Sequence, residues 1–321
     1  ETMSRDRRHK LSPDAGVGGS WILGEARQTS RMKTTNPIRP LLVCLLGALI
    51  ATQTFADSAQ REATKLRMTE GKALFEEKCK TVAGEKVYKT VPEVEGLLLM
   101  KVRPRSGERE QSDLMWPGAA FAREGTADHY ITGFLGHEEA FGPDGKARPI
   151  TPKHRGYINT ASRPGVKEYP GYRWVEVLDE KDGKRYRVTG SHKAVGKKDT
   201  SAYNVQLALK KDPDYDLNVY QWSLDKSPAP GASPRYGVTF EDHVIPEERK
   251  RGLASSTVKV LDLKTGEVLG EMLRYAWSPG APSPANPTPW LTAYVCPGHA
   301  EAAGTTTRMF VDQVLIPKKD Q

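Results

Sequence analysis

Residues 257–275 read TVKVLDLKTGEVLGEMLRY, and this stretch decides the fold class. Two apolar-rich segments, 257–263 and 267–275, are separated only by Lys264-Thr265-Gly266. A short connection that ends in glycine between two such segments is typical of a β-hairpin. The stretch therefore predicts two antiparallel strands.

Further strand patterns lie on both sides of this hairpin. The segments 172–178 and 184–190 flank Asp-Glu-Lys-Asp-Gly, which predicts a second hairpin. The remaining predicted strands are 86–91, 96–102, 203–209, 236–240 and 290–295. No repeat is evident, so the sequence predicts one α+β domain, residues 57–321, built mainly on an antiparallel sheet.

Helical patterns lie at the two ends of this domain. Residues 58–82 predict an N-terminal helix, with Leu74, Phe75, Cys79 and Val82 on one face and Ser58 as its N-cap. Gly71 in the middle leaves two shorter helices as an alternative. Residues 306–315 predict a short C-terminal helix.

The first 56 residues resemble a leader rather than part of the fold. Residues 41–51 (LLVCLLGALIA) form an apolar core after Lys33 and Arg39, and Thr54-Phe55-Ala56 fits a cleavage site. We therefore expect a signal peptide at 32–56, an upstream non-native or disordered extension at 1–31, and no membrane span after cleavage. An uncleaved N-terminal anchor is the alternative. Export predicts a periplasmic or secreted protein.

Charge and cysteine content follow from that division. The first 56 residues hold eight of the 48 Lys and Arg and four of the 40 Asp and Glu, so the net charge falls from +8 to +4. This charge argues against nucleic acid as a partner. Cys79 and Cys296 remain, and in an oxidising compartment we expect them to form a disulfide. Two buried thiols are the alternative.

Residues 106–170 contain the densest group of potentially catalytic side chains. Asp128 and His129 lie close in sequence to His137, Glu138 and Glu139. A histidine with carboxylates could act as acid and base or bind zinc. The spacing is not His-Glu-x-x-His, so we assign no metal site, and surface histidines are the alternative.

Other catalytic motifs are missing from the sequence. No Gly-x-Ser-x-Gly follows the leader, and neither a P-loop nor a Gly-x-Gly-x-x-Gly motif occurs. The sequence around Cys79 lacks the second cysteine and the histidine of a haem attachment site. We therefore expect no cofactor. Trp116 and Trp290 lie beside prolines in loop settings, so they are the candidates for a recognition surface.

Several segments together resemble secreted proteins of Gram-negative bacteria with no assigned activity. They are GEKVYKTVPEVEGLLLMKVRP (84–104), MWPGAAF (115–121), PRYGVTFED (234–242) and PWLTAYVCP (289–297). The resemblance implies export and no catalytic residues. We expect a non-enzymatic periplasmic binding or protein-interaction protein with an unknown periplasmic partner; one version is an antidote to an envelope-acting toxin. The alternative is a periplasmic hydrolase that uses the His129–Glu139 region, with or without a metal.

Overall fold

The computed structural model describes residues 58–140, 157–160, 168–169, 171–179, 181–298 and 304–318, and for 137–140, 157–160 and 168–169 it describes only the backbone. The strands are β1 (Gly84–Val87), β2 (Val91–Val94), β3 (Gly96–Leu99), β4 (His137–Ala140), β5 (Tyr157–Thr160), β6 (Glu168–Tyr169), β7 (Trp174–Leu178), β8 (Arg185–Lys197), β9 (Asn218–Pro228), β10 (Tyr236–His243), β11 (Leu253–Asp262), β12 (Val268–Trp277), β13 (Tyr294–Cys296) and β14 (Leu315–Pro317).

Helical segments alternate with these strands. They are η1 (Arg67–Gly71), α2 (Lys72–Thr81), α3 (Glu108–Ser112), η2 (Pro117–Phe121), α4 (Asp128–Leu135), α5 (Tyr203–Lys211), α6 (Pro246–Lys250), η3 (Pro289–Thr292) and α7 (Thr306–Val314). Residues 58–66 are also helical. The predicted N-terminal and C-terminal helices are thus both present.

A mixed nine-stranded sheet forms the centre of the fold, in the order β1-β12-β11-β10-β3-β7-β8-β9, and β13 also pairs with β12. The β10–β3 and β3–β7 pairs are parallel, and the other pairs of this sheet are antiparallel. Two smaller sheets pair β14 with β2, and β4 with β5 and β6. The predicted α+β class with mostly antiparallel strands is confirmed.

The β11–β12 hairpin follows the prediction from its turn. Gly266 has φ +77°, a left-handed conformation that glycine adopts without a steric penalty. Its N–H donates to the Asp262 carbonyl at 2.8 Å, and the Asp262 carboxylate accepts from the Lys264 N–H at 3.0 Å. The Arg235 guanidinium lies 2.9 Å from the same carboxylate and lowers its pKa. Asp262 therefore holds the turn through both its carbonyl and its carboxylate, and Arg235 holds Asp262.

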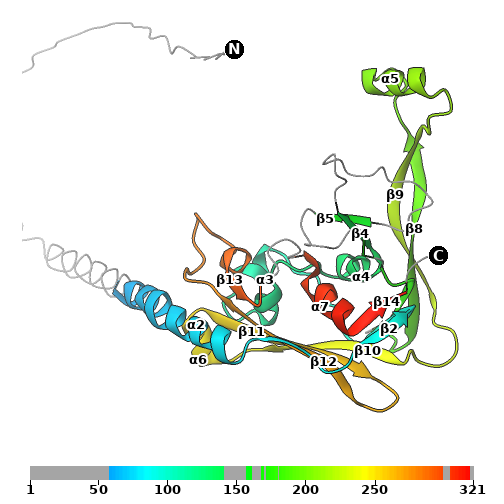
Figure 1. Cartoon of the computed structure of the whole chain (residues 1–321). Helices are drawn as coiled ribbons and strands as arrows, with labels where there is room; N and C mark the ends of the chain where they lie inside the picture. Colours follow the sequence, from blue (N-terminus) through cyan, green and yellow to red (C-terminus); the bar gives the residue numbers. More distant parts are fainter. Residues whose placement is uncertain are drawn as a thin grey trace, which may run out of the picture. The chain divides into compact units, whose positions relative to one another are not determined.

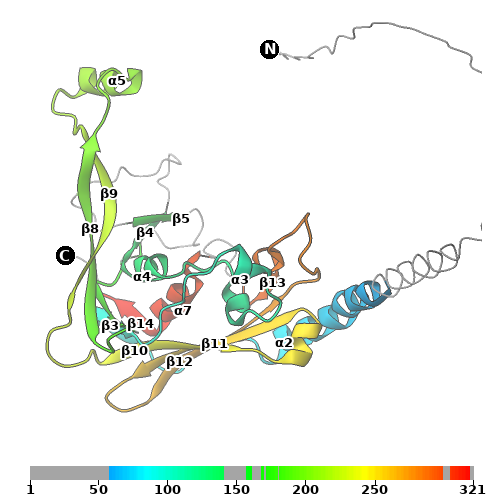
Figure 2. The same cartoon turned by 180° about the vertical axis from the view of Figure 1, so that it is seen from behind.

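One face of the sheet carries the main hydrophobic core. Val238 and Phe240 of β10 lie opposite Val260 and Val258 of β11, and all four are buried. Phe121 of η2, Phe134 of α4 and Phe310 of α7 belong to the same core cluster. Figures 1 and 2 show α4 and α7 on the same side of strands β10–β12. The helices therefore cover this face of the sheet.

The opposite face carries the N-terminal helix. Leu74 and Phe75 pack against a second cluster that contains Tyr275 and Trp277. The disulfide between Cys79 and Cys296, whose Cα atoms are 5.8 Å apart, links this helix to β13 and confirms the predicted pairing. Val82 does not share the buried face: it follows the end of α2 and is 44% exposed.

One predicted strand is wrong and another is only partly correct. Residues 203–209 form helix α5, which Figure 1 shows at the end of the β8–β9 ribbon. Only Val205 of this helix is buried, so its apolar residues do not form a buried strand. In the predicted strand 290–295, Pro289 begins the short helical turn η3 and only Tyr294–Cys296 is extended. Proline fits the first helical position because it needs no N–H there.

The predicted strand 86–91 is also divided. β1 ends at Val87 and β2 begins at Val91. The N–H groups of Tyr88 and Lys89 both donate to the Leu269 carbonyl, at 2.9 and 3.0 Å. Two donors on one acceptor interrupt the regular hydrogen-bond pattern between antiparallel strands. The pairing of this segment with β12 therefore ends here.

Candidate functional site

A groove of about 710 Å³ lies beside the central sheet. It is lined by Met100, Lys101, Val102, Arg103, Pro104, Arg105, Ala127, Asp128, Ile131, Val177, Leu178, Asp179, Lys181, Gly183 and Lys226. These residues follow β3, lie at the start of α4, form the end of β7 and its turn into β8, and belong to β9. The groove is thus built from four separate segments of the chain.

The topology explains why a groove forms here. β3 and β7 are parallel neighbours, so their carboxyl ends, Leu99 and Leu178, lie at the same edge of the sheet. After these ends the chain turns away to different elements. Ligand sites in sheets with parallel strands occur at such carboxyl ends. The position of the groove therefore marks it as a candidate binding site.

Positive charge dominates the lining of the groove. Five lining residues are cations and two are carboxylates. The Lys226 ammonium lies 2.6 Å from Asp179, and its hydrogen bond lowers the pKa of that carboxyl. Within the described part of the chain, the exposed Arg105 and Lys181 form no ion pair. These two side chains can therefore meet an anionic ligand.

Arg103 connects the groove to the protein interior. The residue is 3% exposed, and its guanidinium lies 4.1 Å from the ring centres of both Phe121 and Phe240. Its Nε donates to Glu124 at 3.0 Å and its Nη1 to Asp242 at 3.2 Å. Burial alone would lower the pKa of Arg103, but the two carboxylates raise it above its ordinary value.

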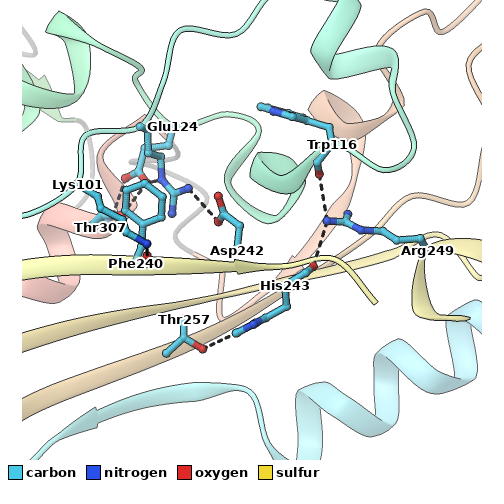
Figure 3. Close-up of polar contacts among 10 residues, drawn as sticks. Lys101, Trp116, Glu124, Phe240, Asp242, His243, Arg249, Thr257 and Thr307 are labelled. Carbon is cyan, nitrogen blue, oxygen red and sulfur yellow. Dashed lines mark hydrogen bonds and ion pairs between the residues drawn. The ribbon is translucent and has the colours of Figure 1, made fainter. Parts of the chain in front are cut away.

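Glu124 joins this cation to the C-terminal helix (Figure 3). Its Oε2 accepts from the Thr307 hydroxyl at 2.6 Å, and its Oε1 accepts from the Thr307 N–H at 2.7 Å. Thr307 lies in the first turn of α7. A buried carboxylate at a helix N-terminus satisfies an otherwise free backbone donor and fits the helix dipole.

The N-terminus of α4 forms another wall of the groove. Ala127, its N-cap, has φ +51° and ψ −123°, a conformation unfavourable for a residue with a Cβ. Its N–H donates to the Arg103 carbonyl at 2.8 Å, so a tertiary contact holds it. Backbone strain of this kind is concentrated at binding and active sites. It supports the groove as the functional part of this region.

The predicted catalytic group is distributed along α4. Asp128 and His129 begin the helix and are exposed, whereas His137 and Glu138 follow it in β4. Helix α4 has eight residues and is therefore about 12 Å long. Asp128 lines the groove. The side chains of His137 and Glu138 lie outside the described residues, so their convergence stays a prediction.

Trp116 and Trp290 meet at Arg249. The Arg249 Nη2 donates to the Trp116 carbonyl at 3.0 Å and to the His243 carbonyl at 3.2 Å, as Figure 3 shows. The guanidinium lies 5.3 Å from the Trp290 ring centre, and burial lowers its pKa to about 10. Trp290 is only 1% exposed, so its assignment to a recognition surface is wrong, because the ring fills the core. Trp116 is half-buried.

Sequence reasoning missed the basic residues of the groove. Lys101, Arg103 and Arg105 alternate directly after the buried strand β3. Because ligands bind at the carboxyl ends of parallel strands, basic side chains directly after a buried strand could have indicated this site.

The described residues contain neither a cluster of metal ligands nor a membrane-spanning helix. Among them, no three His, Cys, Asp or Glu side chains gather as metal ligands would. In the same part of the chain, no helix combines the length and apolar character needed to cross a bilayer. Comparison of the chain with known protein families, with curated proteins and with solved structures gives no match.

Proposed function

We propose that this chain is a binding protein whose basic groove takes an acidic, partly apolar segment of a partner protein. The observation that carries the proposal is the excess of cations in a groove at the carboxyl ends of β3 and β7. Complementary charge speeds encounter and selects the partner. The leader at 32–56 supports a periplasmic or secreted location for this interaction.

The lining supports a peptide-like ligand. Met100, Ile131, Val177 and Leu178 contribute apolar surface next to Lys101, Arg105 and Lys181. An acidic segment with apolar side chains would bury those side chains while its carboxylates meet the cations. An envelope-acting toxin with an acidic surface segment is one partner of this kind, which retains the antidote as a specific version.

A defined peptide tests the proposal. A labelled peptide of alternating Glu and Leu should bind the chain, and a Lys-Leu peptide should not, as measured by fluorescence anisotropy. The double variant Arg105→Glu/Lys181→Glu should weaken binding about tenfold or more, because each reversed contact is worth up to about 1 kcal/mol. Lys250→Glu makes a matched change on α6, whose residues do not line the groove. Equal affinity of the wild type and the double variant would contradict the proposal.

The hydrolase alternative has less support. It requires His137 and Glu138 to approach His129 or Asp128, and α4 separates the two pairs along the chain. Its test is His137→Ala, which should abolish hydrolysis or metal uptake without unfolding the protein. No described contact favours it over binding.

A further inference from the structure

A row of three polar residues crosses the covered face of the sheet. Asp242 of β10 lies directly opposite Ser256 of β11, and Ser256 lies directly opposite Arg274 of β12. Directly opposite residues have Cβ atoms about 5 Å apart. Ser256 is 0% exposed and Arg274 is 3% exposed. The row is therefore a buried polar strip within an otherwise apolar core face.

The carboxylates near this row already have partners. Asp242 accepts from Arg103 through Oδ1, and both oxygens of Glu124 accept from Arg103 or Thr307. In contrast, Nε and Nη1 of Arg274 and the hydroxyl of Ser256 have no hydrogen-bond partner among the described residues. The unsatisfied groups of the two neighbouring residues are all capable of donating, so both lack the same thing: an acceptor.

Arg274 is also held away from solvent by an aromatic ring. Its guanidinium lies 4.8 Å from the ring centre of Phe121, the ring that also contacts Arg103. Burial lowers the pKa of Arg274 to about 10, so the group still carries its charge at neutral pH. The Glu124 carboxylate offsets part of this burial, but Nε and Nη1 of the guanidinium still have no acceptor among the described residues, and unpaired buried donors cost stability. A negatively charged acceptor would offset that cost.

We propose that Arg274 and Ser256 bind a small inorganic anion within the core of the folded chain. A monatomic anion such as chloride suits this pair, because the unpartnered donors of two directly opposite residues can both donate to one spherical acceptor beneath Phe121. This ion belongs to the fold and is separate from the ligand of the groove: neither Arg274 nor Ser256 lines the groove. The ion stabilises the sheet at the point where β11 and β12 place polar residues on the face that the helices cover.

Thermal unfolding of the full chain at constant ionic strength tests the site. The probe is sodium chloride, exchanged against sodium gluconate, whose large organic anion serves as the reference. We expect the melting temperature to rise saturably with chloride. At a chloride concentration 100 times the dissociation constant, the folded state gains about 100-fold over the unfolded state. Sodium bromide should act like chloride.

Variants locate the ion. Arg274→Met should remove the dependence on chloride. Ser256→Ala keeps the guanidinium and should raise the half-maximal chloride concentration about fivefold, the value of one hydrogen bond. Lys250→Gln removes an exposed charge from α6 and should leave the response unchanged.

Two results would overturn the inference. One is a wild-type melting temperature that is equal in chloride and gluconate. The other is a chloride response retained in Arg274→Met, which would place the ion elsewhere. If Arg274→Met does not fold, Ser256→Ala decides alone, and an unchanged half-maximal concentration in that variant counts against the site.

Discussion

Glu124→Gln should be among the most destabilising conservative substitutions in this protein. The Glu124 side chain is 2% exposed, and its carboxylate accepts hydrogen bonds from Arg103 Nε, the Thr307 hydroxyl and the Thr307 N–H. Glutamine has nearly the same shape but offers one acceptor oxygen and one NH₂ donor. Whichever way the amide turns, its NH₂ faces a donor of Arg103 or Thr307. At least one buried donor is therefore left unpaired.

The size of the effect follows from the partners that remain. Breaking a buried ion pair by removing one charge costs about 3–5 kcal/mol. Arg103 keeps Asp242 at 3.2 Å, which favours the lower half of that range. We expect a loss of about 3 kcal/mol in the free energy of unfolding. For a chain of this size, such a loss lowers the melting temperature by about 10 °C.

Urea unfolding followed by circular dichroism measures this loss. The control is Glu267→Gln, which removes a carboxylate that is 49% exposed and 3.5 Å from Lys89. That exposed pair should be worth less than about 1 kcal/mol. A loss below about 1 kcal/mol for Glu124→Gln as well would refute the reasoning, because the Arg103 charge would then be stable in the core without its nearest partner.

Three further predictions concern other parts of the fold. Reduction of the disulfide, which closes a separation of 217 residues, should cost up to about 5 kcal/mol, and coinciding melts with and without reductant would contradict this. Gly71→Ala should destabilise by about 1–3 kcal/mol in urea unfolding, since the added Cβ would lie 2.1 Å from the Arg251 carbonyl. The lowered pKa of Asp262 contributes stability above about pH 4; this stability disappears as the pH falls, so Asp262→Asn should flatten the acid side of the stability profile.

The correct sequence predictions depended on local patterns. The β11–β12 hairpin was predictable because both strands and their turn are contiguous, and Gly266 supplies the required conformation. The disulfide was predictable because only two cysteines follow residue 56 and one lies on the apolar face of a helix. The hairpin could be predicted from a few consecutive residues, and the disulfide from the number of cysteines.

Helix α5 shows where a local pattern is insufficient. Its residues alternate apolar and polar side chains as a half-buried strand would, yet Tyr203 is 77% exposed and Leu207 is 40% exposed. The segment has no neighbouring strand to pair with, because β8 and β9 pair with each other on either side of it. A backbone without a pairing partner satisfies its own hydrogen bonds as a helix. Alternation therefore predicts a strand only where the segment also lies beside another strand.

The groove could not be predicted because its segments meet through long-range parallel pairing. β3 and β7 are separated by more than 70 residues, and their neighbouring ends give the groove its position.

The burial of Arg274, unlike the position of the groove, is related to a local sequence pattern. Met272, Arg274 and Ala276 alternate on β12, so Arg274 must point to the same face as two buried apolar residues. A strand rarely places arginine on a core face, since the charge then needs an acceptor from outside its own ladder. The alternation of β12 therefore places Arg274 in the buried polar strip once the core face of the strand is known.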